Sequence, residues 1–440
     1  MVSLRMSLRV MPAFWFALPI VLLAGGYGTA LYPADHYGLG ATAMGTGALV
    51  FVAGFTAATA AWEGARLRRT VWWSPTVRSR LAIAAWAVLP SVLVGVVAML
   101  AAVGVLLVRS GATLPDLRVL AVVLLDLVAW AVVGFAAGIL LPVPVAVPVG
   151  LLLPFVWLAF VPALYPVWLR HLTGMFRDCC GLSQDLAPAA VGASVLADIG
   201  IIIAAAILIG GWTIARRHGG SILTLAVSIV ASMVALAVPL AAGVTLVSGM
   251  TYAPVVPRDP ALLTCRERAG LTLCVWPEHV PEIDELATVA SDVHSRWLAA
   301  GIEAPAIFTE ADRTVAPAGS LTYQVSRTAP DDVVLALANG MTPQTPYCES
   351  LTPGAPAATT GGLATIWLQA WYSAAGGLSA DRLAQEYGSP WGMGGGTLDP
   401  LPTVDALWKV SPEARRAWAA HAAALIVTCE EVTVDLAVRP

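Results

Sequence analysis

Residues 62–80 read WEGARLRRTVWWSPTVRSR and separate two long apolar runs. The stretch carries five arginines, one glutamate and three tryptophans. Arginine in a short connection between two membrane-spanning helices holds that connection on the cytoplasmic side, and tryptophan marks the interface between membrane and water. This stretch therefore predicts the orientation of the helices on both sides of it.

The composition around this stretch is that of a membrane protein. Hydrophobic residues make up 58% of the 440 residues and charged residues only 12%, whereas soluble domains carry about 25% charged residues. The sequence contains seven apolar runs close to the length of about 20 residues that a spanning helix needs. They cover approximately residues 12–31, 41–62, 82–108, 119–141, 143–164, 190–213 and 221–249. A cleaved signal peptide is an alternative for the first run, which follows Arg5 and Arg9.

Arginine placement predicts the topology. With a cytoplasmic N-terminus, the connections on that side carry 9 arginines and those on the opposite side carry 4. An odd number of spans then places residues 250–440 outside the cell. Residues 1–249 carry a net charge of +6 and residues 250–440 a net charge of −10, which indicates two regions in different surroundings.

These patterns predict a multi-pass α-helical plasma-membrane protein with about seven spans and an extracytoplasmic α+β domain. We expect six helices within residues 1–220, a seventh at 221–249 and the α+β domain at 250–440. In that domain the sequence predicts a helix over 280–300 and strands over 322–326 and 332–338. Ser411, Pro412 and Glu413 predict the start of a helix that runs to about residue 427.

The cysteines agree with this topology. Cys265, Cys274, Cys348 and Cys429 lie in the C-terminal region and are candidates for disulfides, with three possible connectivities. Extracytoplasmic exposure permits such bonds. Cys179 and Cys180 are adjacent, which disfavours a bond between them. Pairing elsewhere and free thiols are both open for these two residues.

Several catalytic patterns are absent from the sequence. It contains no G-x-x-x-x-G-K-[ST], no H-E-x-x-H and no G-x-S-x-G. His279, Glu282 and His294 are close in sequence, but their spacing suits no metal site, and we expect surface histidines there. We therefore predict no catalytic residue, metal or cofactor and no nucleic-acid partner, with the lipid bilayer as the main environment.

Two carboxylates lie inside predicted spans, Asp126 in the fourth run and Asp198 in the sixth. Carboxylates within a membrane are costly and usually face a cavity or a partner. Both are therefore candidates for a transport path. A protonated or hydrogen-bonded aspartate at a contact between helices is the alternative for Asp126, and contact with the lipid headgroups is the alternative for Asp198.

The chain resembles the ABC-2 family of transporter permeases over about residues 1–217. In that family a glutamate and a basic stretch open the connection between spans two and three, as Glu63–Gly64 and Arg66–Arg69 do here, and a Pro-Val-Ser-Arg pattern closes it. The corresponding stretch here, Ser74–Arg78, reads SPTVR, with the order of Val and Ser/Thr changed. The predicted hairpin between spans four and five and the long connection before span six follow the family order. Residues 250–440 resemble domains appended to membrane proteins associated with ABC transporters in actinobacteria.

The resemblance implies a permease subunit of an exporter that is not itself an enzyme. A separate ATP-binding subunit would hydrolyse ATP, and two permeases would work as a homodimer or a pair. The docking residues that the resemblance implies are Glu63, Arg66, Arg68, Arg69, Trp72, Pro75 and Arg78. The alternatives are a membrane-anchored extracytoplasmic binding or sensor protein without transport activity, and an enzyme acting on the outer face.

Overall fold

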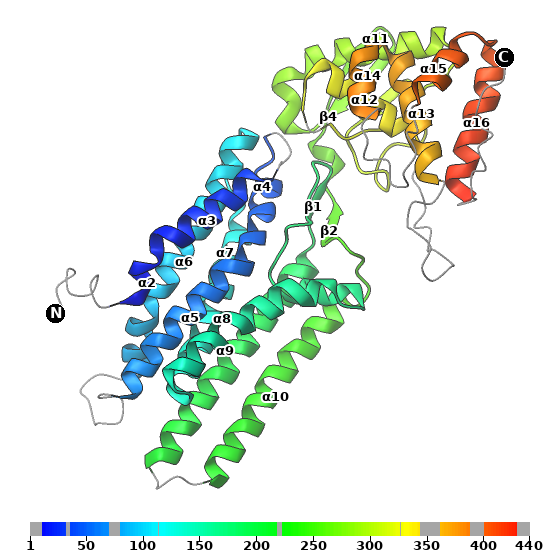
Figure 1. Cartoon of the computed structure of the whole chain (residues 1–440). Helices are drawn as coiled ribbons and strands as arrows, with labels where there is room; N and C mark the ends of the chain where they lie inside the picture. The colour runs from blue at the N-terminus through cyan, green and yellow to red at the C-terminus, as the bar shows by residue number, and fades with distance from the viewer. Residues whose placement is uncertain are drawn as a thin grey trace. The chain divides into compact units, whose positions relative to one another are not determined.

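The computed structural model describes residues 11–31, 36–69, 80–112, 114–217, 222–325, 327–343, 361–387 and 400–428. The chain divides into two compact units at residues 256 and 257. We call residues 1–256 the helical unit and residues 257–440 the C-terminal unit (Figure 1). Each is described by itself.

The helical unit is built from long apolar helices. They are α2 (Pro12–Trp15), α3 (Ala17–Thr29), α4 (Gly38–Gly45), α5 (Leu49–Arg68), α6 (Arg80–Ser110), α7 (Leu117–Leu140), α8 (Val143–Phe160), α9 (Pro188–Arg217) and α10 (Ile222–Val247). The 3-10 turn η1 (Thr46–Ala48) joins α4 to α5. Within the described residues, six helices are long and apolar enough to cross a membrane, with α4–α5 counted as one. The protein is therefore membrane-embedded.

Six of the seven predicted runs coincide with these helices. The first predicted run is divided at Phe16 into α2 and the 13-residue α3, so it is shorter than the others. The predicted hairpin is confirmed, because α7 ends at Leu140 and α8 begins at Val143. Helix α5 packs against α6, α7 and α8, and α9 lies between α7 and α10 (Figure 1).

The connection between α8 and α9, residues 161–187, is a folded segment that we call the α8–α9 loop. It contains the 3-10 turns η2 (Val161–Ala163) and η3 (Val167–Leu172) and the strand β1 (Gln184–Leu186). β1 pairs with β2 (Val255–Pro257), which follows α10. The loop is thus held to the chain that leaves the last long helix.

The C-terminal unit packs helices on a small mixed sheet. Its strands, in the order in which they lie, are β3 (Thr264–Arg268), β4 (Leu271–Val275), β5 (Ile307–Thr309) and β6 (Leu321–Thr322). β3 and β4 are antiparallel, whereas β4, β5 and β6 run parallel. The helices are α11 (Ile283–Ala299), α12 (Pro330–Met341), α13 (Gly361–Gly376), α14 (Ala380–Tyr387), α15 (Leu401–Trp408) and α16 (Pro412–Thr428), with 3-10 turns η4 (Pro260–Leu262) and η5 (Pro277–Glu282).

Two predicted elements of this unit are confirmed and one is wrong. α11 and α16 lie where the sequence predicts helices, and Ser411 Oγ accepts a hydrogen bond from Ala414 N–H at 3.3 Å. The predicted strand at 332–338 is the helix α12. Pro330 at its first position and two aspartates in its first turn favour a helix start. The predicted strand at 322–326 is reduced to β6, which ends at Thr322.

Candidate functional site

The arginine-rich end of α5 has distinct roles for its charged side chains. Glu63 is buried and forms an ion pair with the exposed Arg66, with Oε1 and Nη1 3.5 Å apart. Arg68 Nη1 donates to the carbonyl oxygen of Leu140 at 3.3 Å, so it satisfies a backbone acceptor at the end of α7. Arg69 is exposed. Of the predicted docking residues, Trp72, Pro75 and Arg78 lie outside the described residues.

Glycine allows this end of α5 to approach α7 at the level of the backbone. A Cβ added to Gly138 on α7 would overlap the carbonyl oxygen of Ala61, and one added to Gly64 on α5 would overlap the carbonyl oxygen of Phe135. Gly134 meets Ala57 in the same way one turn earlier. Small residues at four-residue spacing are typical of tight helix packing in membranes. Helices α5 and α7 are therefore in close backbone contact at the charged end.

The structure brings together the two carboxylates that the sequence identified separately. Asp126 on α7 and Asp198 on α9 are 1% and 3% exposed, and their side chains lie next to each other. Trp130 Nε1 donates to Asp126 Oδ1 at 3.1 Å. The alternative of headgroup contact for Asp198 is wrong, because this side chain is buried against Asp126. No local sequence pattern indicates this pairing, since the two residues are 72 positions apart.

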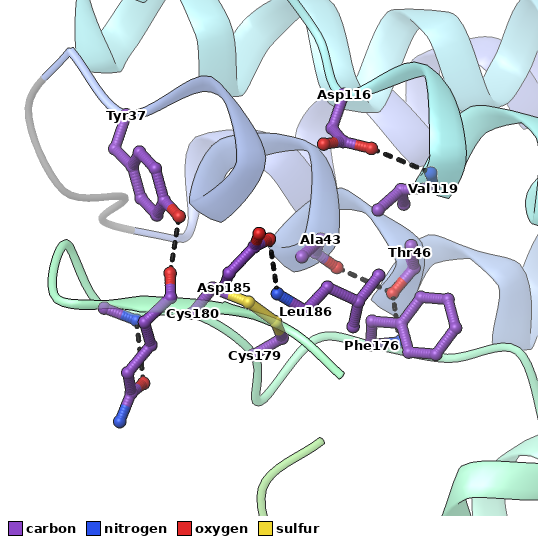
Figure 2. The surroundings of a disulfide bond; sticks show 12 residues. Tyr37, Ala43, Thr46, Asp116, Val119, Phe176, Cys179, Cys180, Asp185 and Leu186 are labelled. Atoms are coloured by element: carbon purple, nitrogen blue, oxygen red, sulfur yellow. Dashed lines mark hydrogen bonds between the residues drawn. A yellow bond between two sulfur atoms is a disulfide. The ribbon is translucent and has the colours of Figure 1, made fainter. Parts of the chain in front are cut away.

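The α8–α9 loop covers this pair. Gly174 has a φ of +70°, and a Cβ built on it would lie 3.8 Å from Asp126 Oδ1. Ser194, one turn before Asp198 on α9, has its Oγ 2.9 Å from the carbonyl oxygen of His171 and 3.0 Å from that of Ala190, so its one hydroxyl proton is shared between the loop and α9. On the opposite flank, Phe176 N–H donates to Thr46 Oγ1 at 2.8 Å (Figure 2). The loop is thus fixed to α9 and η1 on both sides of the carboxylates.

The same loop contains Cys179 and Cys180, which the structure joins as a disulfide (Figure 2). The expectation that they pair elsewhere or remain free is therefore wrong in this structure, because the fold buries both thiols against each other. Beside them, Tyr37 Oη donates to the carbonyl oxygen of Gln184. Asp116 caps α7 by accepting from Val119 N–H at 3.1 Å (Figure 2).

Contacts from the start of the loop hold the chain that follows α10. His171 Nε2 lies 2.9 Å from the carbonyl oxygen of Thr251. Burial lowers the pKa of His171, against the opposing effect of this hydrogen bond. Arg170 forms an ion pair with Asp178 at 2.7 Å, and its guanidinium lies 3.5 Å from the ring centroid of Tyr252.

The C-terminal unit contains one of the predicted disulfide pairs. Cys265 and Cys274 are directly opposite each other on β3 and β4 and are bonded. The bond closes the hairpin covalently. Cys348 and Cys429 lie outside the described residues.

A buried histidine–glutamate pair lies beside this sheet. His279 is fully buried, and its Nδ1 is 2.6 Å from Glu310 Oε1. Glu310 Oε2 accepts from Trp276 N–H at 2.8 Å. Burial raises the pKa of Glu310. Burial by itself lowers the pKa of His279, but its hydrogen bond to Glu310 and the charges of Glu310, Glu282 and Glu278 raise it overall.

The expectation that His279 is a surface residue is therefore wrong. It lies in η5, the turn that follows β4 and Trp276, and Glu310, directly after β5, contacts it in the core. The sequence holds no local signal for that contact, because the two residues are 31 positions apart. The pair joins η5, the turn after β4, to the residue that follows β5.

Comparison with known proteins gives one match. Residues 273–429 match a family described as a domain of unknown function, DUF7224. No curated protein and no solved structure matches the chain. The matched segment includes the last three residues of β4, the His279–Glu310 pair and helices α11 to α16, so these features belong to the region of family similarity. The helical unit lies outside the match, and its function has to be argued from its own geometry.

Proposed function

We propose that the chain is the permease subunit of an ABC-2-type exporter that a separate ATP-binding subunit energises. In this proposal α2 and α3 together form a first of seven spans. They cover 18 residues, or about 27 Å at 1.5 Å per residue, close to the hydrocarbon thickness of about 30 Å. The N-terminus is then cytoplasmic, and the C-terminal unit is extracytoplasmic. Two such permeases act together.

The observation that carries the proposal is the end of α5. Arg66 and Arg69 are exposed there, directly after a stretch that packs backbone to backbone against α7 through Gly64 and Gly138. A partner bound to these arginines would therefore pull on α5 and α7 as one body. Transport by such a complex needs a mechanical contact of this kind, because ATP is hydrolysed on one subunit and the transported molecule crosses the membrane through another.

The order of elements supports the same proposal. The connection between α5 and α6 precedes a tight hairpin between α7 and α8, and the short turns η2 and η3 precede α9. This is the order that the resemblance implies for an ABC-2 permease. The buried carboxylates of α7 and α9 then lie inside the transporting part of the molecule.

Co-purification tests the proposal. An ATP-binding subunit should accompany the tagged full chain from its native membrane, and Arg66→Glu together with Arg69→Glu should strongly reduce the amount recovered. Arg68 is left unchanged because it caps α7. The matched control is Arg177→Glu, an exposed arginine in the α8–α9 loop, which should leave recovery unchanged. Recovery that is unaffected by the double charge reversal would exclude this end of α5 as the docking element. Absence of any ATP-binding partner would favour the membrane-anchored binding protein.

A further inference from the structure

The contact between Asp126 and Asp198 requires a proton between the two carboxylates. An ionised carboxylate only accepts hydrogen bonds, so two carboxylates bond to each other only when a proton lies between them. The two side chains lie close enough here, between α7 and α9, for one proton to bridge them. The second oxygen of each, Oδ2, is buried without a partner. The Trp130 indole supplies a single donor to the four carboxylate oxygens.

The position of the pair excludes two charges as its resting state. Asp126 is nine residues into α7 and Asp198 ten residues into α9, which places both about 15 Å from the helix starts. Two adjacent negative charges at that depth would lose their hydration and repel each other. One shared proton removes one charge and satisfies the facing oxygens.

Cations that would otherwise neutralise the pair are engaged elsewhere. The helices packed against α7 and α9 are α4, α5, α6, α8 and α10, together with η3 of the loop. α4, α8 and α10 carry no charged residue. In the described part of the remaining elements and the loop, each basic side chain has a partner: Arg66 with Glu63, Arg68 with Leu140, Arg109 with Thr29, Arg118 with Asp116 and Asp185, Arg170 and Arg177 with Asp178, and His171 with Thr251.

The α8–α9 loop is the barrier between the pair and the nearer end of the helices. Gly174 is in contact distance of Asp126, and the loop on either side of it is bonded to Ser194 and Thr46. A proton that enters or leaves from this end therefore requires the loop to loosen. The bond from Ser194 Oγ to the carbonyl oxygen of His171 is the anchor nearest to Asp198.

We infer that Asp126 and Asp198 form an exchangeable proton-binding site, in which one proton is shared by the two carboxyl groups and the α8–α9 loop controls its exchange with water. On release the proton passes to water and leaves both groups as carboxylates. No electron transfer or further reactant is involved. The inference does not depend on the proposed export function, because it concerns the isolated chain.

Infrared difference spectroscopy of the full chain in phospholipid nanodiscs tests the site. A pH step should change a carboxylic-acid C=O band in the wild-type protein. That band should shift in Asp126→Asn and in Asp198→Asn and be lost in the double variant. Asparagine keeps the size of aspartate and, like a protonated carboxyl group, both donates and accepts hydrogen bonds, so these variants should fold. Asp185→Asn, in the exposed ion pair with Arg118, is the control and should retain the band. A band unchanged in the double variant would overturn the site, and so would a change caused by sodium ions at constant pH.

Exchange into heavy water tests the role of the loop. Ser194→Ala removes one anchoring hydrogen bond, worth about 1 kcal/mol, so the shared proton should exchange about fivefold faster. Ser228→Ala is the matched control, because Ser228 Oγ bonds only within α10 to the carbonyl oxygen of Thr224 among the described contacts. Exchange that is equally fast in wild type and Ser194→Ala would remove the loop from the inference.

Discussion

The two units of the chain differ in the side chains that cover their surfaces. In the helical unit small residues make up much of the interior, with Ala41, Ala53, Ala57, Ala60 and Ala61 fully buried. Large side chains such as Leu106, Phe135 and Ile139 are buried there too, but many other large apolar side chains face outwards. On α10 the exposed ones are Ile222, Leu223, Val227, Ile229, Val230, Met233, Val234, Val238 and Leu246.

The C-terminal unit buries its largest aromatic side chains. Its core contains Trp276, Trp297, Trp371 and Phe308, all fully buried. The helix α11 carries apolar residues on one face and acidic residues on the other. The difference follows from the solvent of each unit. Water drives large apolar groups inwards, whereas lipid accepts them on the surface, and close packing of small residues then holds the helices together.

The largest expected effect comes from a substitution in the core of the C-terminal unit. Trp297 is 0% exposed and donates from Nε1 to the carbonyl oxygen of Tyr372 at 2.8 Å. Trp297→Ala should destabilise this unit by about 3–5 kcal/mol, through lost burial and a cavity. A urea titration of the detergent-solubilised full chain, followed by near-ultraviolet circular dichroism, measures the loss. Trp408→Ala, at a side chain that is 45% exposed, should cost much less. Equal losses for the two variants would contradict the assigned core.

A smaller effect is expected from one added methyl group in the helical unit. Gly138→Ala introduces a Cβ that overlaps the carbonyl oxygen of Ala61 on α5, so it should destabilise the unit by about 1–3 kcal/mol. The matched control is Gly104→Ala in α6, where no atom lies within 4 Å of the added Cβ. The control should be neutral or slightly stabilising, since alanine favours helix. Thermal unfolding in detergent compares the two. A lower midpoint for Gly104→Ala than for Gly138→Ala would refute the close approach of α5 and α7.

The smallest effect is a pH dependence confined to the C-terminal unit. The pKa of His279 is raised above its ordinary value of 6.5 by Glu310 and neighbouring carboxylates, against the effect of burial. The stability from the protonated imidazole is therefore complete below pH 6.5 and is lost as the pH rises through the raised value. The raised pKa of Glu310 acts in the same direction.

Urea titrations at a series of pH values measure this slope. His279→Gln should flatten it, whereas His421→Gln, at an exposed position on α16, should preserve it. If the stability of the C-terminal unit rose with pH over this range, the assigned protonation of His279 would be contradicted.

Sequence patterns predicted the helical unit well because each spanning helix must be apolar along its whole length. The hairpin after Leu140 and the helix that starts at Pro412 were also predictable, since proline and capping residues act within a few positions. The helix α12 was missed because its paired valines and leucine suggested a strand, although Asp331 and Asp332 favour a helix start. The strand propensity of these valines is outweighed there by the burial of one apolar helix face.

The sequence by itself determined that the protein is embedded in a membrane, which residues form its long helices, and that its arginines gather after α5. Those properties depend on composition and on neighbours within one helix. Only the tertiary structure decided that Asp126 meets Asp198, that Cys179 bonds to Cys180, and that His279 is buried against Glu310. Each of these contacts joins residues through the geometry of the folded backbone, and the energy of a buried carboxyl or imidazole depends on what that geometry places beside it.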